Sequence, residues 1–321
     1  DTDPNEIVPP IVRANNEQTI FMYLPWSNNL TSNFYQNISD LESVIEKNIL
    51  KNERVIVFMC TEATEATLFE LVYENGKSVR KTYKQYTDPV YTTAEGITSI
   101  LNDVRECTPA QRYSMIIGCH GMGWIPVSNA QSRSNLRVNK MHWEYENVPM
   151  TRYFGGLYPH QTDITTLAQG ISNAGLKMEY ILFDDCYMST VEVAYDLKNV
   201  TNHLIASTCE IMAYGMPYAK IGQYLIGEIN YEKICNGFDD FYSNYEMPCG
   251  TIAVTDCAEL DHLAAIMKDI NSQYTFDTTL TGSLQRLDGY SPVIFFDCGD
   301  YVSKLCSNQE LLAQFNEQLN R

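Results

Sequence analysis

The sequence predicts an α/β fold, with one domain in which helices cover both faces of a mostly parallel sheet. Short apolar runs rich in β-branched and aromatic residues alternate with segments whose apolar residues recur every three or four positions. This alternation is typical of βαβ units, which build parallel sheets. The chain of 321 residues is long enough to bury one large core.

Seven short apolar runs are the predicted strands, because β-branched and aromatic residues favour extended backbone. In chain order they are residues 19–25, 54–60, 67–73, 113–119, 178–184, 202–208 and 250–256. Asn75-Gly76 follows the third run and precedes another strand-like stretch, so it predicts a hairpin and an antiparallel edge. The predicted helices are residues 39–50, 94–106, 163–175, 189–198 and 257–270.

Two segments depart from this pattern. Residues 1–18 are polar and rich in proline, which predicts an N-terminal tether ahead of a domain over residues 19–321. Residues 127–156 show no sustained period, and loops of this length are usually functional or disordered. The basic residues of this loop are Arg133, Arg137, Lys140 and Arg152.

Charge and composition exclude several classes of protein. The formal net charge of −18 repels phosphate backbones, so we expect no nucleic-acid partner. The sequence has no run of eighteen apolar residues, so we expect no membrane-spanning segment. The ten cysteines form no C-x-x-C pair and no Cys/His cluster at zinc spacing, which predicts buried free thiols and no structural zinc.

A histidine and a cysteine follow two of the predicted strands. His120 comes directly after the strand at 113–119, and Cys186 comes just past the strand at 178–184. In parallel sheets the carboxyl ends of the strands form a crevice where catalytic groups gather. We therefore expect the imidazole and the thiol to meet there, with the helix after Cys186 favouring the thiolate.

A thiol beside an imidazole is the pairing of a cysteine acyl-transfer site. The thiolate attacks a carbonyl and the histidine protonates the leaving amine, while backbone N–H groups stabilise the oxyanion. Gly121 and Cys186 are the expected N–H donors. The residues alone leave other interpretations open, because a cysteine after a strand often fills the core and a histidine is often a satisfied polar group.

The residues around both positions resemble a known family. The stretches IIGCHGMGW and ILFDDCYMSTVEVAYDL are similar to those of the clostripain-like cysteine peptidases, relatives of caspases, gingipains and legumains. In that family one strand leads into H-G-x-G-W and the next central strand into D-x-C-x-M. The later stretch LIASTCEIMAYGMPY is similar as well, and the likeness extends over about residues 19–300.

The resemblance implies a caspase-like three-layer sandwich and a cysteine endopeptidase that cleaves after Arg or Lys. His120 matches the catalytic histidine and Cys186 the nucleophile. Asp184 matches the acid at the floor of the primary specificity pocket, where a carboxylate pairs with a guanidinium or ammonium group. Ser207 and Glu210 are weaker candidates for this pocket, and a helix N-cap is the alternative role for Asp184.

Asp185 departs from the family, which usually has a small residue before the nucleophile. A carboxylate beside a thiol raises the thiol's pKa and opposes thiolate formation, unless the carboxylate is paired or points away. This favours a second hypothesis, a catalytically weak or inactive caspase-like protein of the cell surface or envelope. A glycosidase with two carboxylates is a third, but the sequence offers no placed pair of acids.

The resemblance also implies a zymogen that cleaves itself between the two motifs, which makes the four basic residues of the 127–156 loop candidate cleavage sites. Together with the tether-like start, it implies a bacterial protein that is exported, either secreted or lipid-anchored to the envelope. We expect a monomer that acts on proteins or peptides with basic residues. We expect no required cofactor or metal, with calcium binding left open.

Overall fold

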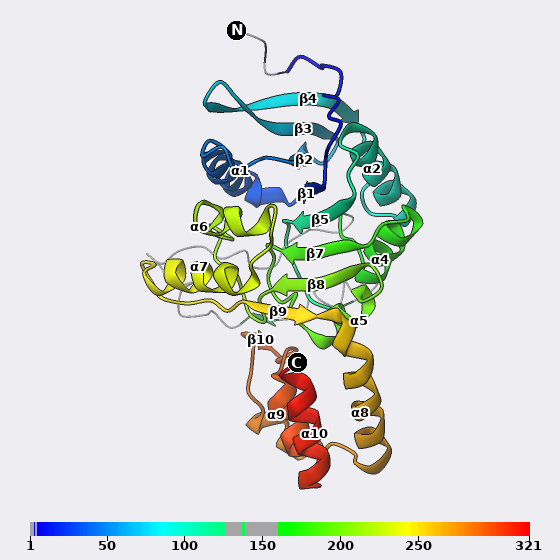
Figure 1. Cartoon of the computed structure of the whole chain (residues 1–321). Coiled ribbons are helices and arrows are strands. Elements are labelled where there is room, and N and C mark those ends of the chain that lie inside the picture. Colours follow the sequence, from blue (N-terminus) through cyan, green and yellow to red (C-terminus); the bar gives the residue numbers. More distant parts are fainter. Residues whose placement is uncertain (1–2, 4, 126–136, 139–159) are drawn as a thin grey trace.

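A mixed sheet of eight strands runs through the middle of the protein (Figure 1). The computed structural model describes residues 3, 5–125, 137–138 and 160–321. The strand order is β4-β3-β2-β1-β5-β7-β8-β9. The strands are β1 (Gln18–Leu24), β2 (Glu53–Glu62), β3 (Glu65–Glu74), β4 (Lys77–Thr87), β5 (Arg112–Ile117), β7 (Met178–Phe183), β8 (Thr201–Ala206) and β9 (Ala253–Asp256).

The centre of the sheet is parallel and its two edges are antiparallel. The pairs β2–β1, β1–β5, β5–β7 and β7–β8 are parallel, whereas β2–β3, β3–β4 and β8–β9 are antiparallel. All seven predicted strands are present within a few residues of their predicted bounds, which confirms the α/β prediction. The antiparallel direction of β9 is not apparent from the sequence.

The predicted hairpin joins β3 to β4. Asn75 and Gly76 form its turn, with φ angles of 52° and 81°. Both angles lie in the left-handed region that a two-residue hairpin turn requires. The hairpin prediction is therefore confirmed, and β4 is the antiparallel edge strand.

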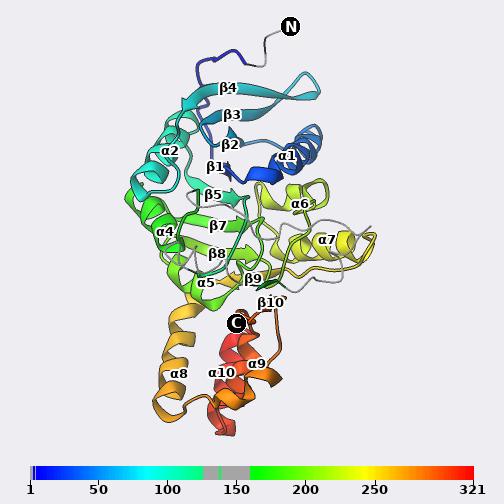
Figure 2. The same ribbon diagram turned by 180° about the vertical axis from the view of Figure 1, so that it is seen from behind.

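Helices cover both faces of the sheet, which gives the domain three layers (Figures 1 and 2). On one face lie α1 (Thr31–Ile45), α6 (Tyr218–Leu225) and α7 (Tyr231–Ser243), and on the other lie α2 (Ala94–Cys107), α4 (Ile164–Asn173) and α5 (Val191–Leu197). Helix α1 begins earlier than its predicted start at residue 39, because Phe34 and Ile38 continue the buried stripe of Leu41 and Ile45.

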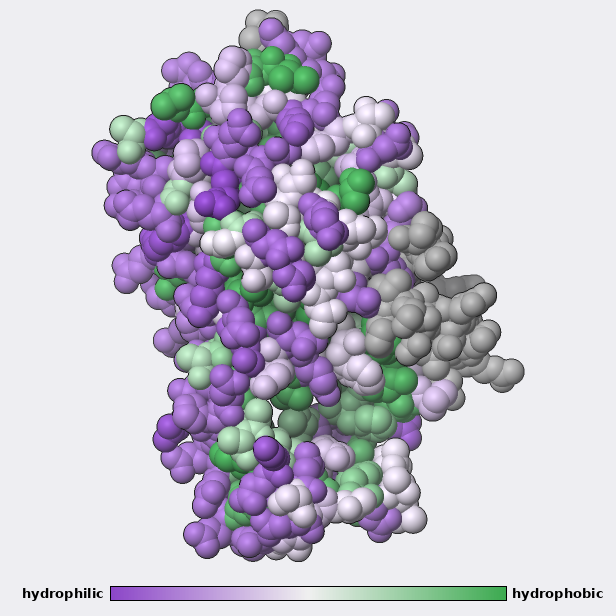
Figure 3. Space-filling model, turned by 90° about the vertical axis from the view of Figure 1, so that its right-hand side faces the viewer, coloured by the Kyte–Doolittle hydropathy of each residue, from purple (hydrophilic) through white to green (hydrophobic). Residues whose placement is uncertain are grey.

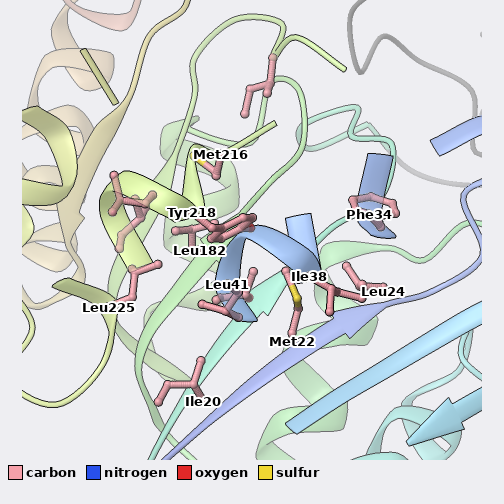
Figure 4. Packing of buried hydrophobic residues seen from close by; sticks show 14 of the residues in the cluster. Ile20, Met22, Leu24, Phe34, Ile38, Leu41, Leu182, Met216, Tyr218 and Leu225 are labelled. Carbon is pink, nitrogen blue, oxygen red and sulfur yellow. The ribbon is translucent and has the colours of Figure 1, made fainter. Parts of the chain in front are cut away.

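Two hydrophobic cores fill the spaces between the layers. The first packs β1, β2 and β7 against α1 and α6, as the side chains of Ile20, Met22 and Leu182 illustrate (Figure 4). The second packs the opposite face of the sheet against α2, α4 and α5. Both faces of the central strands are therefore buried, which explains their continuous apolar runs.

The C-terminal helices form a smaller group beyond β9 (Figures 1 and 2). Helices α8 (Leu260–Gln273), α9 (Cys298–Leu305) and α10 (Gln309–Leu319) pack around their own apolar cluster, which includes Ile270 and Phe315. The remaining short elements are η1 (Asn28–Leu30), η4 (Cys257–Glu259), η5 (Thr278–Ser283) and the two-stranded ladder of β6 (Arg137–Val138) with β10 (Tyr290–Ser291).

The N-terminal segment, which the sequence predicts to be a solvated tether, lies in part along the sheet. The backbone N–H of Val8 donates to the carbonyl of Thr82 in β4 at 2.9 Å. The guanidinium of Arg54 donates to the carbonyl of Ile11 at 2.9 Å and to the carboxylate of Glu70. Both charged side chains are only 2% exposed. Because a buried ion pair needs further hydrogen-bond partners, the segment helps to satisfy this one.

All ten cysteines lie in the described part of the chain, and each is a free thiol, as predicted. Five of them are buried and five are partly exposed, so burial is less general than the sequence predicts; burial raises the pKa of the Cys60 thiol to about 12. Among the described residues, no helix is long and apolar enough to cross a bilayer. On the face that carries α2, α4 and α8, hydrophilic residues predominate, with small hydrophobic groups between them (Figure 3).

Candidate active site

The His120 and Cys186 segments leave the sheet side by side. Strands β5 and β7 are paired in parallel, and their last residues, Ile117 and Phe183, lie opposite each other. His120 and Cys186 each follow three residues after those partners, so His120 is slightly farther from its strand than the sequence predicts. A Cβ atom added to Gly121 would overlap the carbonyl oxygen of Cys186. The backbones of the two motifs are therefore in direct contact.

The imidazole of His120 contacts an amide that the sequence analysis did not identify. Nε2 of His120 lies 2.9 Å from Oδ1 of Asn29, in η1. This short helix follows the carboxyl end of β1, and β1 pairs with β5. The signal in the sequence is the polar stretch SNN, one residue beyond a predicted strand, but strand order alone brings it to His120.

The thiol of Cys186 is fully buried in the first core. Its Sγ accepts the backbone N–H of Ile211 at 3.3 Å and lies 3.8 Å from the carbonyl oxygen of the same residue. The next residue, Tyr187, donates its N–H to the carbonyl of Cys209 at 3.1 Å. The loop that follows β8 is thus bonded to the turn that carries Cys186.

Tyr187 holds this turn in an unusual backbone conformation. Its φ angle is 59°, in the left-handed region that non-glycine residues seldom adopt. Its ring stacks on Phe295 at 4.7 Å, and its hydroxyl donates to Glu210 at 2.9 Å. Burial, and then the charge of Glu210, raise the pKa of the Tyr187 hydroxyl, so it stays protonated and serves as a donor.

The helix after Cys186 does not act as predicted. Helix α5 begins at Val191, and Thr190 caps it by accepting the N–H of Val193 at 3.1 Å. Cys186 precedes the capping residue Thr190 in the chain and is not part of the helix. The macrodipole of a helix acts mainly within its first turn. The prediction that the dipole of this helix stabilises the Cys186 thiolate is therefore wrong. The same observation excludes Asp184 as the N-cap of this helix.

Asp185 faces the neighbouring strand end. Its Oδ1 accepts the backbone N–H of Cys119 at 2.7 Å, and its Oδ2 accepts the Cys119 thiol at 3.3 Å. These two bonds join the segment after β5 to the segment after β7. The carboxylate that departs from the family pattern is therefore hydrogen-bonded outside the Cys186 turn.

Asp184 lies on the other side of this turn and is 1% exposed. Its carboxylate accepts the N–H of Met216 at 3.0 Å and the hydroxyl of Tyr218 at 2.8 Å. Glu210 is also buried and belongs to the same loop after β8. Ser207, at the start of this loop, contacts the Thr251 hydroxyl at 2.8 Å and accepts the N–H of Cys209 at 3.2 Å. The structure thus gathers these acids around one loop.

The predicted cleavage sites are mostly beyond the described residues. Arg133, Lys140 and Arg152 lie outside them, and so does most of the 127–156 loop. The backbone of Arg137 is described and pairs with Ser291 in the β6–β10 ladder. Within residues 5–125 and 160–321, no group of three or more His, Cys, Asp or Glu side chains is arranged to hold a metal ion.

A family model for the clostripain family matches residues 22–293. The chain belongs to the clostripain family. It is accordingly a cysteine-type peptidase, as the resemblance of the two motifs predicts. A search of curated proteins found no match.

Solved structures agree with this assignment. A secreted C11 cysteine protease from Bacteroides thetaiotaomicron, "iotapain", is 74% identical, covering 98% of this chain and 85% of that chain, with a TM-score of 0.87. A clostripain from the same species in complex with the peptide inhibitor BTN-VLTK-AOMK is 75% identical, covering 53% and 76%, with a TM-score of 0.51. An inactive zymogen C11 protease from Parabacteroides distasonis is 26% identical, covering 97% and 83%, with a TM-score of 0.79.

The contact between Gly121 and Cys186 leads to a first prediction. Replacing Gly121 with Ala should lower kcat/KM at least about tenfold, because the added methyl group forces the His120 and Cys186 segments apart. Overpacking of this kind also costs about 1–3 kcal/mol in the free energy of unfolding. Peptidase assays and chemical denaturation measure the two effects.

Gly282→Ala is the matched control, because an added Cβ there meets no atom within 4 Å. It should leave both quantities near their wild-type values. Wild-type kcat/KM in the Gly121→Ala protein would contradict the close approach of the two motifs.

Proposed function

We propose that this protein is an endopeptidase that cleaves after Lys or Arg with Cys186 as nucleophile and His120 as general acid and base. The observation that carries the proposal is the placement of both residues three positions beyond register-paired strand ends. Two parallel strands that end at the same level bring such groups to one crevice. The contact between Gly121 and the Cys186 carbonyl supports this arrangement.

Each chemical step has an assigned group. Sγ of Cys186 attacks the carbonyl carbon, forming a C–S bond while an electron pair moves to the carbonyl oxygen. Backbone N–H groups of Gly121 and Cys186 are the proposed donors to this oxyanion. The C–N bond then breaks as His120 protonates the leaving amine. Water adds to the thioester, His120 takes its proton, and the thiol is released.

Two buried carboxylates support the preference for a basic residue. Asp184 is bonded to the loop after β8 and Glu210 belongs to it, and both are nearly inaccessible to solvent. A buried carboxylate favours a ligand that brings positive charge and hydrogen-bond donors together. The peptide letters of the inhibitor bound to the 75% identical relative, VLTK, end in lysine. Ser207, which contacts the Thr251 hydroxyl, is the proposed wall residue of this pocket.

The buried thiol supports an activation step. Sγ of Cys186 is in contact with Ile211 and is inaccessible to a substrate in the described conformation. The loop after β8 therefore has to move before attack. A relative that is 26% identical is described as an inactive zymogen. The 75% identical clostripain is matched over 53% of this chain only. A cut after Arg152 would leave residues 153–321, roughly half of the chain, which is consistent with such a fragment.

We further propose that the protein is secreted, because the 74% identical relative is described as secreted. Attachment to the envelope by a lipid is the alternative. The hypothesis of an inactive surface protein relied on Asp185, and the bonds from Asp185 to Cys119 weaken it. We also propose that the protein is a monomer and that it needs no cofactor. Calcium binding is left open.

The specificity is tested with fluorogenic peptides that differ only in the last residue. Peptides that end in Lys or Arg should be cleaved at least about a hundredfold faster than a peptide ending in Gln, because the neutral side chain brings no positive charge to the buried carboxylates. Asp184→Asn should reduce this ratio. Cys186→Ala should abolish cleavage, whereas Cys235→Ala, in α7, is the matched cysteine control.

Equal cleavage of the Gln peptide would contradict the basic specificity. Activity in the Cys186→Ala protein would contradict the assigned nucleophile. Inertness of Cys186 toward a Lys-peptide chloromethyl ketone in the wild-type protein after self-processing would instead favour the inactive-protein hypothesis.

Asn29 is expected to position the imidazole. A hydrogen bond from Nε2–H of His120 to Oδ1 of Asn29 fixes the tautomer and orients Nδ1 for proton transfer. Asn29→Ala should lower kcat up to about a hundredfold with little change in KM. Asn29→Asp keeps the acceptor and adds a negative charge that raises the pKa of the imidazole, so the alkaline limb of the pH profile should move to higher pH.

Asn102→Ala, on the exposed side of α2, is the control and should leave the profile unchanged. If Asn29→Ala retains the wild-type kcat and pH profile, then Asn29 does not position His120.

Self-processing is tested by prolonged incubation of the wild-type protein beside Cys186→Ala. The wild type should yield two fragments, and sequencing of the new N-terminus should place the cut after Arg133, Arg137, Lys140 or Arg152. The Cys186→Ala protein should stay intact, because it lacks the nucleophile. A single intact band in both samples would count against self-cleavage.

A further inference from the structure

A cavity of about 100 Å³ opens beside His120. Its apolar walls include Ile97 from α2, Leu167 from α4, Phe183 at the end of β7 and Met188. Each of these four side chains belongs to the core on the α2 and α4 face of the sheet. The cavity therefore borders this core, and its polar lining residues include His120, Asp163 and Asp185.

This cavity and the proposed basic pocket lie on opposite faces of the sheet edge. The partners of Asp184, which are Met216 and Tyr218, belong to the core on the α1 and α6 face. The side chain of Cys186 belongs to that core too, whereas Ile97, Leu167, Phe183 and Met188 of the cavity wall belong to the other. The segments that carry His120 and Cys186 lie between these two faces.

The chemistry of peptide cleavage assigns a different part of the substrate to each face. The acyl part, with its basic side chain, stays bonded to Cys186 and extends toward Asp184. The leaving part begins with the nitrogen atom that His120 protonates, so its first residue must lie against the imidazole. Since His120 lines the cavity, the side chain of that first leaving residue is the substrate group closest to it.

We infer that this cavity is the binding site for the side chain of the residue directly after the cleaved bond, and that it selects an uncharged apolar side chain. The inference rests on the proposed function and adds the substrate class on the leaving side. The apolar walls favour burial of an aliphatic or aromatic group. Asp185, which also lines the cavity, and the net charge of −18 disfavour an acidic residue.

Binding of the residue after the cleaved bond is measured most directly by running the acylation of Cys186 in reverse. When an amine instead of water attacks the acyl-enzyme, a C–N bond forms and the C–S bond to Cys186 breaks. His120 takes a proton from the amine, and the sulfur leaves as the thiol after receiving it. The ratio of amide product to hydrolysis product reports binding of the amine alone, because both products come from the same acyl-enzyme.

The experiment acylates the activated enzyme with a Lys-terminated peptide ester in the presence of glycine amide, leucine amide, phenylalanine amide or aspartic acid amide. Product ratios are measured by mass spectrometry. Leucine amide should be transferred about tenfold or more efficiently than glycine amide, because its side chain is buried. Aspartic acid amide should be the poorest acceptor. Similar ratios for all four amines would overturn the inference.

Two substitutions of one wall residue locate the effect. Leu167→Ala enlarges the cavity and should shift the preference from leucine amide toward phenylalanine amide, whereas Leu167→Phe fills it and should shift the preference toward glycine amide. Ile171→Leu is the matched control, since Ile171 lies one turn along α4 and is buried away from the cavity lining. The control should keep the wild-type order of amines.

An unchanged order in both Leu167 variants would overturn the assignment of the cavity, whatever their absolute rates. A wild-type enzyme that forms no acyl-enzyme from the Lys ester would instead overturn the proposed function, and the inference with it. A preference for leucine amide that survives in both variants would place the apolar site elsewhere.

Discussion

The parallel pairing of β5 with β7 is the constraint on which the candidate site depends. Ile117 lies opposite Phe183, so the two chains leave the sheet at the same level and continue for an equal number of residues to His120 and Cys186. A shift in this register would separate the two side chains and turn others toward them. The register is held because both faces of these strands are buried in apolar cores.

The segments beyond these strands are held by hydrogen bonds and stacking rather than by regular structure. Asp185 ties the β7 side to Cys119, while Asp184 ties it to the loop after β8. Tyr187 adds a stacked ring on Phe295 in spite of its left-handed backbone. Strained residues persist where the surroundings over-determine them, and such places are often functional. The same contacts keep the thiol of Cys186 buried in this conformation.

Much of the fold and part of the site were predictable because they are encoded locally. The strands, the Asn75-Gly76 turn and the two motifs can all be recognised within about ten residues of sequence. The wrong predictions concern segments whose structure depends on contacts with residues far away in the sequence or on a capping residue. Helix α5 begins too late to act on Cys186, because Thr190 provides its cap, and the N-terminal segment is docked because Arg54 and Glu70 need partners inside the protein.

The sequence by itself determined which segments are strands and most of the helices, which family the chain resembles, and which two side chains follow the central strands. Tertiary structure alone decided what surrounds those side chains. Asn29 reaches His120 across 91 positions of sequence, and Asp185 reaches Cys119 across 66. The physical reason is that backbone preference is set by near neighbours, whereas contacts at a strand end depend on the order of strands, which the packing of the whole sheet decides.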